Sequence, residues 1–77
     1  MISFYIGDYV KAATNLLDLV REGDAGIIVE IENHPELIII HWKSGKAEGI
    51  NTTLRKEYIK KITKKEAMDI IKTTKVE

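Results

Sequence analysis

The segment Leu37–Lys43 constrains the fold more than any other part of this 77-residue chain. In an extended strand, Ile38, Ile40 and Trp42 point to one side, and the alternate residues on the other side are also largely apolar. A strand that is apolar on both faces is usually covered on both faces. The segment therefore predicts a central strand of a small β-fold.

Glycine and proline divide the rest of the chain into short segments. The turn cluster Glu22–Gly26 precedes the sequence IIVEIE, whose alternation predicts a half-buried strand with Val29 and Ile31 on the buried face. Pro35 interrupts the chain, because proline lacks an amide donor and disfavours helix in the residue before it. A short strand after Gly7 and a last strand over 59–62 complete the prediction. The expected core consists of Val10, Val29, Ile31, Ile38, Ile40, Trp42 and Ile59.

The C-terminal half contains turn and helix signals. Ser44-Gly45 predicts a two-residue hairpin turn, followed by a returning strand over 46–52 and a helical or 3₁₀ turn over 54–58. Thr63 and Glu66 have the spacing of a capping box, and apolar residues follow at helical intervals. A short helix is therefore expected from about Lys64 to Lys72.

Four of these segments together carry a resemblance: GDYV (7–10), GDAGIIVEI (23–31), IIIHWKSGK (38–46) and LRKEYIKKI (54–62). They resemble small SH3-like proteins encoded by tailed bacteriophages and, more distantly, KOW modules and Mind-bomb-type domains. The resemblance covers roughly residues 6–62. It implies that Ile38, Ile40 and Trp42 face inward, so Trp42 is expected in the core or at its rim with its indole N–H hydrogen-bonded, and an exposed recognition tryptophan is the alternative. It implies a mainly β fold, a five-stranded SH3-like barrel over 1–62 with a long first loop, followed by a short C-terminal α-helix within 63–77.

The segment 12–22 is unusually apolar for a connection between strands, because long connections are normally polar. The sequence leaves open whether it is a loop or a helix. Together with the third strand, it offers more apolar surface than one small barrel can bury. This surplus predicts a protein partner or self-association, and the resemblance implies a virion protein or a host factor. The expected contact residues are Leu16, Leu17, Leu19, Val20 and Ile39.

Nucleic-acid binding, as in KOW modules, is the alternative hypothesis. Basic side chains and one tyrosine gather around the last strand and the start of the helix, and such a patch can neutralise phosphates. The solvated surface of an ordinary domain explains the lysines at least as well. The residues of this basic segment are Arg55, Lys56, Tyr58, Lys60, Lys61, Lys64 and Lys65.

The sequence contains no recognisable motif for catalysis. It has no cysteine and two histidines, too few for a histidine-based zinc site, and no nucleotide-binding loop or nucleophile elbow. His41 is expected to be a solvated or hydrogen-bonded strand residue. We therefore expect no enzymatic activity, metal, cofactor or small-molecule substrate. With no membrane-spanning apolar run and no signal peptide, the expected location is the cytoplasm or a virus particle.

Overall fold

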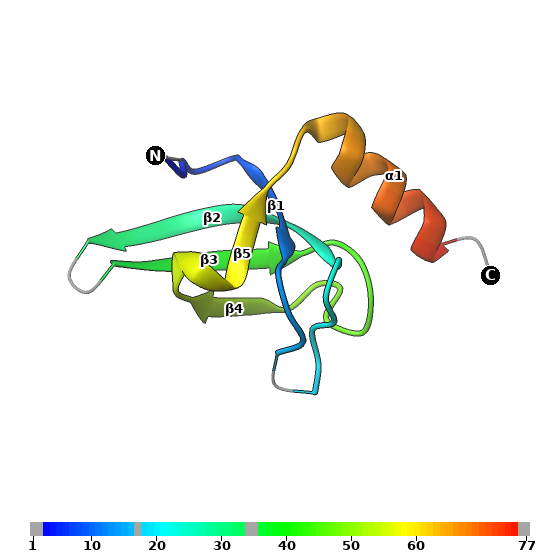
Figure 1. The fold of residues 1–77 in the computed structure, drawn as a ribbon, viewed down its shortest axis with the longest axis horizontal. Helices are drawn as coiled ribbons and strands as arrows, with labels where there is room; N and C mark the ends of the chain where they lie inside the picture. Colours follow the sequence, from blue (N-terminus) through cyan, green and yellow to red (C-terminus); the bar gives the residue numbers. More distant parts are fainter. Residues whose placement is uncertain (1–2, 17, 34–35, 76–77) are drawn as a thin grey trace.

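The computed structural model describes residues 3–16, 18–33 and 36–75. They form a mainly β structure with one C-terminal helix, as predicted (Figure 1). The strands form one antiparallel sheet in the order β4-β3-β2-β1-β5, so that β4 and β5 are its two edges. The elements are β1 (Tyr9–Ala12), β2 (Ala25–Asn33), β3 (Glu36–Trp42), β4 (Asn51–Leu54), the 3₁₀ turn η1 (Lys56–Tyr58), β5 (Ile59–Lys61) and α1 (Lys64–Lys75).

The predicted parity of β3 is confirmed. Ile38, Ile40 and Trp42 are fully buried. The Trp42 indole N–H donates to Thr52 Oγ1 at 2.7 Å, which satisfies the polar atom of an otherwise apolar side chain. Gly26 lies opposite Trp42, where a Cβ atom would come within 2.6 Å of Ile40 Cγ2. Only glycine allows the backbones of β2 and β3 to lie this close over the Trp42 ring.

The predicted parity of β2 is wrong at Val29. Ile28 pairs with Ile40 and Glu30 pairs with Ile39, so Val29 is an extra residue in a β-bulge. The bulge moves the buried side of the strand by one position: Ile28 is 1% exposed, whereas Val29 is 41% exposed. Ile31, beyond the bulge, is partly buried and packs against the core.

One core joins the two parts of the sheet. β2 pairs with β1 along its first residues and with β3 along its whole length, so it belongs to both parts. Side chains from β1 and β5 pack in the same cluster as those from β3 and β4, which requires the sheet to curve around them. The buried members of the cluster are Val10, Ala12, Val20, Ile28, Ile38, Ile40, Trp42, Ala47, Leu54 and Ile59.

The predicted two-residue hairpin at Ser44-Gly45 is also wrong. Residues 43–50 connect β3 to β4, and β4 begins at Asn51 instead of at residue 46. Ser44 is buried, and its hydroxyl accepts the Ala25 N–H at 2.9 Å. Because Ser44 serves as a hydrogen-bond partner for the start of β2, the chain cannot reverse there. Gly45 has a positive φ of 77°, so the glycine does mark a bend, within a longer connection.

The capping box predicted for the helix is confirmed on its threonine side. Thr63 Oγ1 accepts the Glu66 N–H at 3.1 Å, and α1 continues to Lys75, beyond the predicted end. Ala67 is completely buried where α1 contacts β1 and β2. No helix in the described ranges has the length and apolar character needed to cross a membrane.

Candidate interaction surfaces

The connection between β1 and β2 contains a tight turn that packs on the core, and its described residues are not helical. Leu16 and Val20 exchange backbone hydrogen bonds of 2.7 and 3.0 Å, which close a small bridge. Val20 is only 2% exposed, and Leu16 and Leu19 are half-buried against the same core. Leu17 lies outside the described residues. The chain itself buries the Val20 side chain, so this structure leaves little of it for a partner to contact.

Ile39, the remaining predicted contact residue, is half-buried on the outer face of β3. It pairs with Glu30 on one side and with Thr53 of β4 on the other. Ile39 therefore lies on the outer face of the sheet, next to the edge strand β4. Val20 lies in the core and Ile39 on the outer face of β3, so the described members of the predicted contact set do not share one surface.

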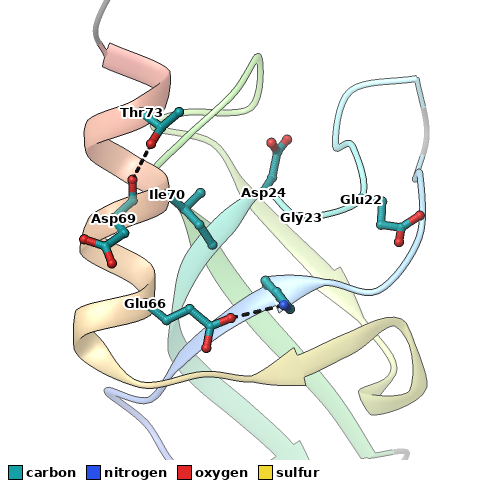
Figure 2. Close-up of a pocket in the computed structure, with 8 residues that line it drawn as sticks. Glu22, Gly23, Asp24, Glu66, Asp69, Ile70 and Thr73 are labelled. Atoms are coloured by element: carbon teal, nitrogen blue, oxygen red, sulfur yellow. Dashed lines mark hydrogen bonds and ion pairs between the residues drawn. The ribbon is translucent and has the colours of Figure 1, made fainter.

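A groove of about 470 Å³ lies between α1 and the turn that precedes β2 (Figure 2). Several of its polar groups already have partners within the chain. Lys11 Nζ lies 3.1 Å from Glu66 Oε2, and Asp24 Oδ2 accepts the Arg21 N–H at 3.0 Å. In the described part of the chain, no group of three or more histidine, aspartate or glutamate side chains is arranged to hold a metal. The lining residues are Lys11, Glu22, Gly23, Asp24, Glu66, Asp69, Ile70 and Thr73.

The basic segment lies on the surface along η1, β5 and the start of α1. All seven predicted residues are exposed, Tyr58 to 40%. Two of the charges are paired: Lys56 Nζ lies 3.6 Å from Glu36 Oε1, and Lys61 Nζ lies 3.2 Å from Asp8 Oδ2. Lys61 also donates to the Ser3 carbonyl at 3.2 Å. The segment is therefore contiguous, but part of its charge is used within the fold.

His41 is hydrogen-bonded on the outer face of the sheet. Its Nδ1 lies 2.6 Å from Asn51 Oδ1, between β3 and β4. The two residues are also register partners. The contact fixes the Asn51 side chain at the first position of β4.

The outer edge of β4 presents unpaired backbone groups. The Trp42 N–H donates to the Ile50 carbonyl at 3.1 Å, and His41 pairs with Asn51 in the same register. Hydrogen-bonded and non-hydrogen-bonded pairs alternate along an antiparallel ladder. Thr52 therefore directs its N–H and C=O toward β3, whereas Asn51 and Thr53 direct theirs away from the sheet. β4 is the lowest strand of the sheet in Figure 1.

The sequence did not reveal this edge, because the returning strand was predicted over 46–52 instead of 51–54. A signal was nevertheless present: Asn51–Leu54 is a rare run without charge in the C-terminal half of the chain. Comparisons with protein-family models, curated proteins and solved structures give no match to this chain.

Proposed function

We propose that this chain is a non-enzymatic protein-interaction module with an SH3-like barrel fold, and that it binds its partner through the outer edge of β4. The observation that carries the proposal is the uncharged edge strand whose Asn51 and Thr53 backbone groups point away from the sheet. Strand addition to such an edge supplies main-chain hydrogen bonds to the partner. An unprotected edge is otherwise a site of uncontrolled pairing.

Three features support the SH3-like description. The long first connection lies between β1 and β2, η1 lies directly before the last strand, and β5 returns to pair with β1. The bulge at Val29 lets β2 contribute to both parts of the curved sheet around one core. These features agree with the resemblance to small phage-encoded SH3-like proteins, which makes virion proteins and host factors the first partners to test.

The experiment compares Thr53→Pro with the unmodified protein in pull-downs from the native source. Proline at residue 53 removes an N–H that points away from β3, and edge strands tolerate such a proline. The fold should survive while strand addition is lost. Thr52→Pro is the matched control, because it removes an N–H directed toward β3 and should unfold the chain. Equal capture of partners by the unmodified protein and by folded Thr53→Pro would refute the proposed function.

The basic segment supports nucleic-acid binding as a second candidate function. Arg55, Lys60, Lys64 and Lys65 are exposed and take part in none of the ion pairs found among the described residues. Fluorescence anisotropy with a random duplex should then show binding that falls steeply with salt. Lys60→Glu with Lys64→Glu should abolish it, whereas Lys72→Glu, farther along α1, should not. Absence of binding at low salt would exclude this candidate.

A further inference from the structure

We infer that the occupant of the β4 edge is β4 of a second copy of the chain, paired antiparallel about a two-fold axis at Thr52. The inference rests on the proposed function and identifies its partner. In this arrangement, Asn51 of each copy lies opposite Thr53 of the other. Because both residues direct their N–H and C=O outward, each pair exchanges two hydrogen bonds, and the two sheets become continuous.

The side chains next to the edge fit this register. Ile50 is 42% exposed, although its parity places it on the core-facing side of the sheet together with Thr52 and Leu54. The two-fold axis places Ile50 opposite Leu54 of the second copy, so the apolar surface of one core continues into the other. The second copy would therefore cover the exposed Ile50 side chain with its own β4.

Charge complementarity favours a second copy over a foreign peptide. The uncharged strand has an acidic residue, Glu48, before it and basic residues, Arg55 and Lys56, after it. Antiparallel pairing brings the end of one strand that carries Glu48 beside the end of the other strand that carries Arg55, at both ends of the interface. A parallel arrangement would place like charges side by side, which is unfavourable. The edge is therefore complementary to itself in one orientation.

The interface is short, so the dimer should be weak. Four residues of edge strand bury less surface than a standard protein–protein interface. A Kd on the order of 100 µM is expected for such a contact. The protein should therefore be mainly monomeric when dilute and dimeric at high concentration.

Sedimentation velocity over about 10 µM to 1 mM tests the association. The unmodified protein should shift from monomer to dimer mass, and Thr53→Val, which retains the outward N–H, should do the same. Thr53→Pro should remain monomeric while circular dichroism shows a folded β-protein. A single monomer mass over the whole range, or an unchanged dimer in Thr53→Pro, would overturn the inference.

A cysteine crosslink tests the register, because the chain has no cysteine of its own. Two Thr52 residues on the axis would form a non-hydrogen-bonded pair with Cα atoms about 4.5 Å apart, within the range of a disulfide. Thr52→Cys should therefore form a covalent dimer under mild oxidation. Lys60→Cys, with its cysteine on β5, should form such a dimer far more slowly. Equal rates for the two variants would overturn the two-fold register.

The two proposals fail in different ways. If the protein stays monomeric but captures another protein, and Thr53→Pro abolishes that capture, the second-copy inference is wrong and the proposed function stands. If folded Thr53→Pro changes neither self-association nor capture, both are wrong.

Discussion

β4 and β5 are the two edges of the same sheet, and their exposed backbones are protected to different extents. β4 has the sequence NTTL and carries no charge. β5 has the sequence IKK, and η1 and α1 adjoin its two ends. Lysines on an edge strand oppose pairing with another chain, because a partner strand would have to desolvate them. The edge that is open to pairing is therefore β4.

The backbone geometry of β5 extends the comparison. The Ile62 N–H donates to the Tyr9 carbonyl at 3.0 Å, so alternation directs the backbone groups of Lys60 toward β1 and those of Lys61 outward. The Nζ atom of the same residue, Lys61, forms an ion pair with Asp8 and lies 5.5 Å from the Tyr5 ring centroid. Residues before β1 therefore contact β5 through the Lys61 side chain. No ion pair of the described residues involves Asn51–Leu54.

The largest effect on stability is expected in β3, whose inward side chains are fully buried. Ile40 is fully buried and pairs with Ile28 and with Thr52. Ile40→Ala should lower the free energy of unfolding by about 2–5 kcal/mol, since it removes buried methyl groups and leaves a cavity. Urea denaturation measures the loss, with Ile39→Ala on the half-buried face as the milder control. Equal losses for the two variants would contradict the assigned faces of β3.

A smaller loss of stability is expected from a substitution on the core-facing side of β4. Thr52→Val preserves the shape of the side chain but removes the acceptor of the Trp42 indole N–H. An unpaired donor on a fully buried side chain costs about 1–3 kcal/mol. Thr53→Val, at the exposed neighbouring position, should be almost neutral in the same urea titration. If Thr52→Val proved as mild as Thr53→Val, the indole hydrogen bond would contribute nothing to stability.

A third effect on stability is expected at the start of α1, the helix that follows β5. Thr63→Ala should lower stability by about 1 kcal/mol, because the first turn of the helix loses the acceptor of the Glu66 N–H. Thr63→Ser keeps a hydroxyl at the cap and should restore most of the loss. Thermal melts followed at a helix-sensitive wavelength test both variants. A serine variant as unstable as the alanine variant would show that the cap acts by another route.

Sequence predicted the features that local interactions determine. The capping box at Thr63 requires residues only three positions apart, and the apolar run of β3 predicts a central strand whatever strands flank it. Because both faces of β3 are apolar, its buried side came from the SH3-like pattern and not from the alternation. The bulge at Val29 depends instead on the pairing of β2 with β3, and a β-branched valine fits either parity. The sequence therefore gave no local sign that Ile28 would replace Val29 in the core.

The candidate site required the same long-range information. The local sequence Ser44-Gly45 is compatible with a hairpin turn. In the structure, however, the Ala25 N–H of β2 donates to the Ser44 hydroxyl, and the chain reverses only after residue 45. As a result β4 begins at Asn51, and the residues of its open edge differ from those that the sequence suggested. Likewise, Val20 is apolar in either interpretation of the segment 12–22, and only its packing on the core distinguishes a buried residue from a contact residue.

The smallest effect on stability is expected at the lysine of β5 that has no ion pair among the described residues. Lys60 is exposed, so Lys60→Thr should change the free energy of unfolding by less than about 0.5 kcal/mol. If charge is what protects this edge, the same variant should show increased attraction between molecules, because Lys61 directs its backbone groups outward. Static light scattering should then give a lower second virial coefficient for Lys60→Thr than for Lys60→Arg, which keeps the charge. The measurement uses Thr53→Pro as the background, so that association through β4 does not contribute. An unchanged coefficient would mean that the shortness of β5 and its neighbours protect it, and that charge does not explain the difference between the two edges.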